Sequence, residues 1–184
     1  QTEPYLPAAA ARVLEEARER GLFPADGRRL ELALLARLRA LSLEELAALP
    51  DVSEGLENRL YNAIRASCSI EELEAAVKTK RYTLARVRRL ILSAFLGIRA
   101  DDAAACPPYI RILGLGKGGR EILARMKSSA TLPVDTSLKR LSRRGGGCER
   151  TAALEAASAD LYALALPVVL PCGYDQTAPA VKAD

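Results

Sequence analysis

Histidine and tryptophan are absent from this 184-residue chain, and phenylalanine occurs only twice. Without histidine the chain lacks the commonest general base of enzymes and cannot form a Ser–His or Cys–His nucleophile pair. We therefore predict no catalytic residue here. No apolar run approaches the roughly 20 residues that cross a bilayer, so we expect no membrane partner.

The four cysteines lie 38, 42 and 24 residues apart, at Cys68, Cys106, Cys148 and Cys172, and form no CxxC pair. Zinc sites usually need closely spaced Cys or His ligands, so we predict no metal site. Four reduced thiols are typical of a cytoplasmic protein. The chain begins at Gln1 without an initiator Met or a signal-peptide pattern, and we expect a piece cut from a longer protein.

Alanine, leucine, arginine and glutamate dominate, which favours helices. We predict a helical domain over residues 1–100, with capping boxes at Ser42 and Ser69. Its strongest helix begins after Thr83 and ends at Gly97, the position of a C-terminal cap. The expected apolar face of this helix comprises Leu84, Val87, Ile91, Ala94 and Phe95.

Residues 101–184 are predicted to form a smaller α/β appendage. We expect short strands over 109–113 and 132–135, a glycine turn with a helix over 118–127, a flexible basic loop over 142–147, and a last helix over 149–166. The proline-containing tail is expected to be irregular. The predicted fold class is therefore mainly α: a helical domain with a strand-turn-helix appendage and at most two short strands.

Charge is distributed unevenly along the chain. The net charge of +4 combines −5 over residues 1–74, +12 over 75–150 and −3 over 151–184. Solubility alone does not require positive charge to be grouped. A basic middle segment is typical of a surface that binds a polyanion such as nucleic acid.

Six cations and no acid fall between Lys78 and Arg89. Most of them crowd the start of the helix that Thr83 caps, where cations are unfavourable and a phosphate is favoured. Tyr82 could stack on a base. Together with two cations further along the chain, this pattern predicts RNA-binding residues Lys78, Lys80, Arg81, Tyr82, Thr83, Arg86, Arg89, Lys117 and Arg120.

Two other interpretations remain open. The basic stripe could be structural, pairing with the acidic first third or docking on an acidic partner protein. Alternatively, residues 114–119 satisfy GxGxxG between an expected strand and helix, and Asp135 follows at the distance of a ribose-binding acid. A dinucleotide-dependent enzyme would need several more parallel strands than the sequence indicates, so we predict a tight turn there.

Several blocks resemble, in order, the carboxy-terminal region of the bacterial tRNA(Met) cytidine acetate ligases, long catalogued as predicted nucleotidyltransferases. The blocks span nearly the whole chain and comprise residues 49–60, 78–83, 88–90, 96–98, 109–114, 119–123 and 160–164.

The resemblance implies a parent enzyme that uses ATP with Mg and acetate to form N4-acetylcytidine at the wobble position of elongator tRNA(Met). Its nucleotide site, with an HxGH-type motif, would lie in an amino-terminal α/β catalytic domain. We expect that domain to be missing here, so that this chain alone is inactive and needs no cofactor. Its expected partners are tRNA and the missing catalytic domain, and the Lys78–Thr83 motif is the expected tRNA-facing element.

Overall fold

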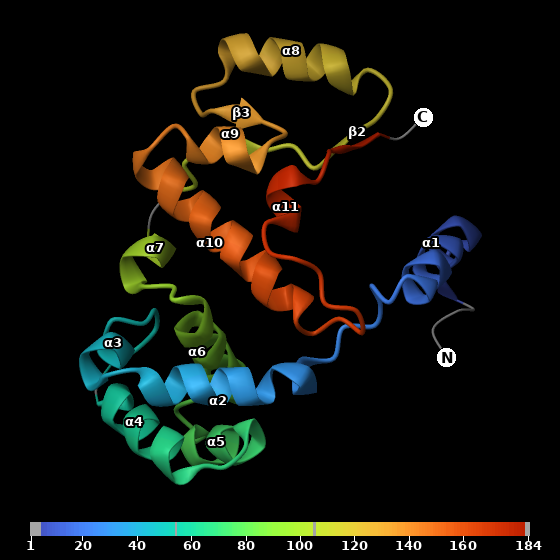
Figure 1. Ribbon diagram of the computed structural model, residues 1–184. Helices are drawn as coiled ribbons and strands as arrows, with labels where there is room; N and C mark the ends of the chain where they lie inside the picture. The colour runs from blue at the N-terminus through green and yellow to red at the C-terminus, as the bar shows by residue number, and fades with distance from the viewer. Residues whose placement is uncertain (1–4, 54, 105, 183–184) are drawn as a thin grey trace.

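The computed structural model describes residues 5–53, 55–104 and 106–182. Its first part is helical throughout (Figure 1). In chain order the elements are α1 (Ala8–Glu19), the 3-10 helix η2 (Gly27–Leu30), α2 (Glu31–Ala40), α3 (Leu43–Ala47), α4 (Leu56–Ala66), α5 (Ile70–Val77), α6 (Leu84–Leu96) and α7 (Ala100–Ala104).

The second part mixes strands and helices. It contains β1 (Ile110–Arg111), β2 (Gly114–Leu115), α8 (Gly119–Ser129), β3 (Val134–Asp135), α9 (Leu138–Ser142), α10 (Gly146–Ala163), α11 (Tyr174–Thr177) and β4 (Val181–Lys182). A small core of buried residues lies between β1, α9 and α10, and Leu138 and Leu141 are its most buried members.

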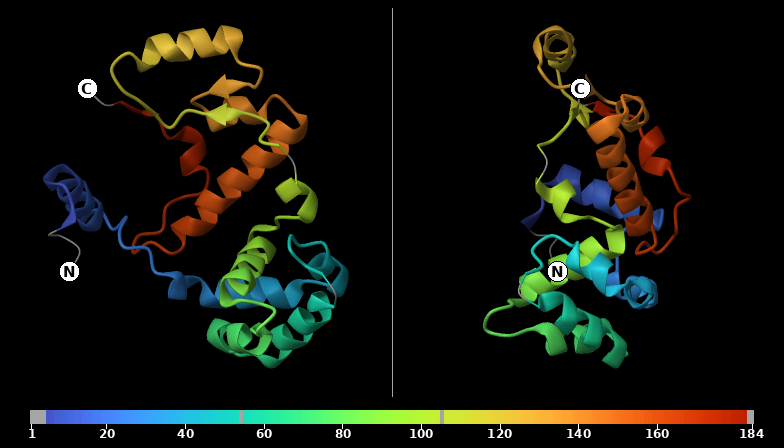
Figure 2. Two further views of the ribbon diagram at one scale, coloured as in Figure 1. Left: turned by 180° about the vertical axis from the view of Figure 1, so that it is seen from behind. Right: turned by 90° about the vertical axis from the view of Figure 1, so that its left-hand side faces the viewer.

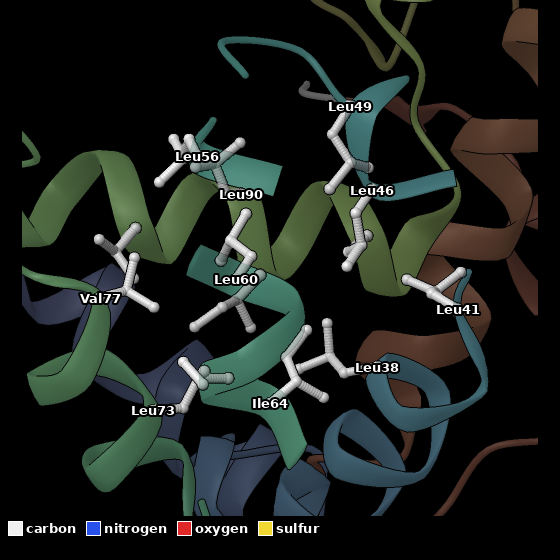
Figure 3. Packing of buried hydrophobic residues seen from close by; sticks show 14 of the residues in the cluster. Leu38, Leu41, Leu46, Leu49, Leu56, Leu60, Ile64, Leu73, Val77 and Leu90 are labelled. Carbon is white, nitrogen blue, oxygen red and sulfur yellow. The ribbon is translucent and has the colours of Figure 1, made fainter. Parts of the chain in front are cut away.

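A larger core holds α2 to α6 together (Figure 3). Leucines dominate it, and Leu56, Ile64 and Leu73 have no exposed surface. Burying a side chain of this size contributes about 1.5–3 kcal/mol, so the apolar stripes of these helices fix the position of α6. That helix contributes Val87, Leu90, Ile91, Ala94 and Phe95 to the core.

Capping residues define the helix ends, largely as the sequence predicts. Ser42 forms a complete capping box with Glu45, and Thr83 accepts from the backbone N–H of Arg86 at the start of α6. Gly97 ends α6 at a φ of 70°, a left-handed conformation that glycine adopts without strain. At Ser69 the box is incomplete, because the Glu72 carboxylate accepts from Cys68 instead.

The predicted fold class, mainly α with at most two strands, is wrong. Among the described residues, four short strands form two parallel pairs, β1 with β3 and β2 with β4, so the fold is helix-rich α/β. The prediction failed because each strand has only two residues, too few to show a period-two pattern.

Residues 110–115 supply both strand pairs. The N–H groups of Ile110 and Ile112 donate to the β3 segment, whereas the carbonyl of Leu113 accepts from Val181, the first residue of β4. Successive residues of an extended strand present their polar groups to opposite edges. We therefore infer that β3 and β4 flank one central segment, with α8 as the crossover from that segment to β3.

Two local predictions in the second part are also wrong. The stretch 142–147 is not a flexible loop: α9 ends at Ser142, and α10 begins at Gly146 after one tight turn. The tail contains both α11 and β4. Arg111 holds this tail, since its guanidinium donates to Asp175 of α11 and to Glu155 of α10.

The two parts contact each other through α10. Arg150 donates to the carbonyl of Gly97 at 2.9 Å and to the carboxylate of Asp102, while Leu161 packs against the larger core. A domain boundary near residue 100 stays a prediction. Helix α1 buries no residue and stands apart from both cores (Figures 1 and 2). Among the described residues, no helix is long and apolar enough to cross a membrane.

Candidate nucleic-acid interface

A tight turn joins α5 to α6 and carries the first cations of the basic stripe. The hydroxyl of Thr79 accepts from the N–H groups of Arg81 and Tyr82, and the Thr79 N–H donates to the Tyr82 carbonyl at 3.0 Å. These bonds close the turn locally. Lys78, Lys80 and Arg81 are exposed on it.

Tyr82 anchors this turn from inside. Its side chain is only 8% exposed and belongs to the larger core. The guanidinium carbons of Arg81 and Arg86 lie 5.7 and 5.3 Å from the ring centroid, within cation–π range. In this position the ring is covered by protein, so the observed structure gives it an anchoring role and offers no face to a base.

Arg86 is turned toward the loop before α4. Its guanidinium donates to the carbonyl of Asp51 and lies 3.5 Å from the hydroxyl of Ser53, while its Nε is buried and has no hydrogen-bond partner among the described residues. Asp51 has a φ of 61°, unusual for a residue other than glycine. Arg86 therefore stabilises this loop as well as lying near the α6 start.

The other two arginines of the stripe pair with acids of the first third. Arg88 donates to both carboxylate oxygens of Glu74 at 2.8 and 2.9 Å, a bond that raises the pKa of Arg88. Arg89 lies 3.7 Å from the Asp51 carboxylate, and both side chains are more than half exposed. Exposed pairs of this kind contribute about 0–1 kcal/mol.

The basic stripe thus divides into two sets. Arg86, Arg88 and Arg89 make contacts that the structural interpretation anticipated. Lys78 and Lys80 make no ion pair with any described residue and stay exposed beside the α6 N-terminus. These two lysines are the members of the stripe most available to a phosphate.

Lys117 and Arg120 lie elsewhere on the molecule. Both are exposed on the glycine turn and first residues of α8, where Gly118 has a φ of 76°. Both views of Figure 2 place α8 at one end of the molecule and α4 and α5 at the other. The structure therefore does not bring them together with the Lys78–Arg89 stripe, and any RNA that touches both must span the two parts.

The predicted ribose acid, Asp135, is already engaged. It accepts from the Arg140 guanidinium at 2.6–3.0 Å and from the N–H of Ser137 at 2.9 Å. The bond from Arg140 lowers the pKa of Asp135 to about 2. This arrangement favours a simple turn at residues 114–119 and argues against a dinucleotide site there.

The sequence reasoning missed three cations near this pair. Lys139, Arg143 and Arg144 are exposed at the end of α9 and in the turn before α10. The signal was present as the high positive charge of residues 139–144, but only residues 142–147 were interpreted, as a flexible basic loop. In the described part of the chain, no group of three or more His, Cys, Asp or Glu residues is placed to hold a metal ion.

Residues 1–174 match the family model described as HIGH Nucleotidyl Transferase. The chain belongs to this family. One relative, the tRNA(Met) cytidine acetate ligase of Thermoanaerobacter sp. (strain X514), is 30% identical over 182 residues, which is 98% of this chain and 45% of the relative. The enzyme of the same name from Clostridium tetani (strain Massachusetts / E88) is 41% identical over 90 residues, 47% of this chain and 22% of the relative.

Two solved structures of another protein are also similar to this chain. The apo crystal structure of Thermotoga maritima TmcAL superposes with a TM-score of 0.85 at 26% identity, covering 96% of this chain and 45% of that one. A second structure of that protein, bound with alpha-thio ATP, has the same TM-score. The chain spans less than half the length of each of these relatives.

Proposed function

We propose that this chain holds tRNA for an ATP-dependent tRNA(Met) cytidine acetate ligase that forms N4-acetylcytidine at the wobble position. The observation that carries the proposal is the pair of exposed lysines, Lys78 and Lys80, beside the N-terminus of α6. The partial positive charge of that terminus and the two ammonium groups favour the same ligand, a phosphate of the RNA backbone.

The names of the relatives support tRNA as the substrate, and the nucleotide bound in Thermotoga maritima TmcAL supports ATP as the co-substrate. In this proposal Arg81 and Arg89 border the contact surface. Thr83 fixes the helix start, whereas Tyr82 and Arg86 hold the turn in place from inside. ATP with Mg and acetate bind to an amino-terminal catalytic domain, and the enzyme works in the cytoplasm.

A tRNA-binding assay with a matched charge control tests this proposal. The variant Lys78→Gln/Lys80→Gln should bind elongator tRNA(Met) about threefold to tenfold more weakly than wild type at 0.1 M salt. The control Arg12→Gln/Arg20→Gln removes the same charge from α1 and should bind as wild type does. Equal tRNA binding by the wild type and both variants would contradict the assignment of Lys78 and Lys80 to RNA binding.

A second candidate function, a protein-interaction module without RNA contact, is favoured by the ion pairs that Arg88 and Arg89 make within the chain. It predicts no tRNA binding that depends on Lys78 or Lys80. We also propose that adenylation takes place outside this chain. An acetate-dependent pyrophosphate-exchange assay should therefore give no turnover with the chain alone, and clear turnover would contradict the proposal.

A further inference from the structure

Three cations in α9 and in the turn before α10 have no part in the proposed function. Lys139 and Arg143 are four residues apart and so lie on one side of the α9 segment, and Arg144 follows directly. All three side chains are exposed. We refer to Lys139, Arg143 and Arg144 as the α9–α10 basic surface.

The acids nearby do not neutralise this surface. Asp135 accepts from Arg140, which lies between the three cations in sequence, and Glu149 makes no hydrogen bond with them. No ion pair joins Lys139, Arg143 or Arg144 to an acid in the described part of the chain. The adjoining N-terminus of α10 carries partial positive charge, so it does not offset the charge of the three cations.

From these observations we infer that the α9–α10 basic surface is a second contact for the phosphate backbone of RNA. The inference rests on the proposed function and extends it to a surface in the other part of the molecule. Three uncompensated cations within six residues repel one another, and a polyanion removes that repulsion while releasing its own counterions.

The surface of the molecule is hollowed beside Arg144. A hollow of about 470 Å³ lies between Arg144 and residues 130–135, at the level of β3. A backbone phosphate can therefore approach the guanidinium of Arg144 without displacing protein. Arginine also presents a planar fork of N–H donors that matches a phosphate better than a lysine does.

The two parts of the chain are held together, so this surface and Lys78/Lys80 keep a fixed relation. Arg150 bonds to Gly97 and Asp102 across the junction, and Leu161 packs on the larger core. One RNA that touches both surfaces binds the second contact intramolecularly, which raises its affinity above that of either contact alone.

The test is the triple variant Lys139→Gln/Arg143→Gln/Arg144→Gln. Its control is Arg12→Gln/Arg20→Gln/Arg29→Gln, which removes the same charge from other exposed positions. The slope of log K against log salt for tRNA should become shallower by about 2–2.7 units in the triple variant, because each of the three lost phosphate contacts removes about 0.7–0.9 units. The control should keep the wild-type slope, and the variant Arg143→Lys/Arg144→Lys should keep most of it.

Four outcomes decide the inference. A wild-type slope in the triple variant, with weakened binding by Lys78→Gln/Lys80→Gln, would overturn it while the proposed function stands. Equal losses in the triple variant and its control would also overturn it, because net charge alone would then explain the effect. A reduced slope in the triple variant only would support it, even if the two lysines proved irrelevant. Binding of an acidic protein, but not tRNA, through the three cations would overturn it as well.

Discussion

The guanidinium of Arg88 donates to both carboxylate oxygens of Glu74, at 2.8 and 2.9 Å, across the gap between α5 and α6. This bond neutralises one cation in the middle of the basic stripe. Lys78, at the end of α5, and Lys80, in the following turn, have no such partner in the described part of the chain. Pairing with Glu74 or Asp51 therefore distinguishes Arg88 and Arg89 from the two lysines that we assign to RNA.

The first prediction follows from this pair. Replacing Glu74 by Gln should free Arg88 and strengthen tRNA binding by about twofold to fivefold, with a salt slope steeper by up to about one unit. Folding stability should fall by about 1 kcal/mol, because the Arg88 side chain is 59% exposed whereas that of Glu74 is only 15% exposed. The control Glu44→Gln removes an exposed acid at α3. Filter binding across a salt series measures the affinity and the salt slope of each variant. A gain in affinity equal to that of the Glu44→Gln control would contradict the prediction.

The second prediction concerns Tyr82. Because its ring is part of the larger core, Tyr82→Ala should lower the free energy of unfolding by about 3–4 kcal/mol, as for other large aromatic truncations. Tyr82→Phe keeps the ring and should change both stability and tRNA affinity little. Urea denaturation and tRNA titration measure these effects. Strong loss of RNA affinity in a fully folded Tyr82→Phe variant would show that the phenol contacts RNA.

Local sequence signals were sufficient for most of the helical part. Ser42, Thr83 and Gly97 mark helix ends through bonds to neighbouring residues, so a short window contains the information. The strands were not predictable in this way. β2 pairs with β4, whose partner residues Gly114 and Val181 are far apart in sequence, and neither strand is long enough to show alternation.

The candidate site, too, was predictable only where local sequence determines it. The sequence indicates which residues are cationic and close to a helix start, and it correctly predicts Thr83 as the cap. It cannot show that the Tyr82 ring is buried or that Arg86 bonds to the loop at Asp51, since these depend on tertiary packing. The α9–α10 basic surface was missed because three glycines in the sequence obscured the start of α10.

The third prediction concerns pH and the junction between the two parts. The Arg150 guanidinium, hydrogen-bonded to Asp102, lowers the pKa of that carboxyl to about 2, below its value of about 3.9 in unfolded chains. A depressed folded pKa stabilises the protein above pH 4, and this contribution is lost as pH falls from 4 to 2. Since Arg150 is half exposed, we expect no more than about 1–2 kcal/mol.

Asp102→Asn should therefore lower the free energy of unfolding at pH 6 and change it little at pH 2.5. The pH dependence should become shallower but not vanish, because Asp135 also has a pKa of about 2. Urea denaturation at a series of pH values measures this. A variant that loses equal stability at both pH values would contradict the electrostatic explanation.

The fourth prediction concerns Arg111, which is 9% exposed and holds Glu155 and Asp175. Arg111→Ala leaves both carboxylates without their cation and should destabilise the second part by about 3–5 kcal/mol. The amides of α11 and β4 should exchange faster with solvent, whereas those of α4 and α5 should keep their protection. Hydrogen exchange followed by mass spectrometry measures this, and uniform loss of protection throughout the chain would contradict it.

The salt dependence of tRNA binding by the unmodified chain tests the central claim most directly. If backbone phosphates bind Lys78, Lys80 and the cations of the second part, log K should fall linearly with log salt, with a slope of about −3 to −5 for four to six contacts. Lys78→Gln/Lys80→Gln should make that slope shallower by about one to two units. Binding that is insensitive to salt, or no measurable binding at 50 mM salt, would contradict the assignment of this chain to tRNA recognition.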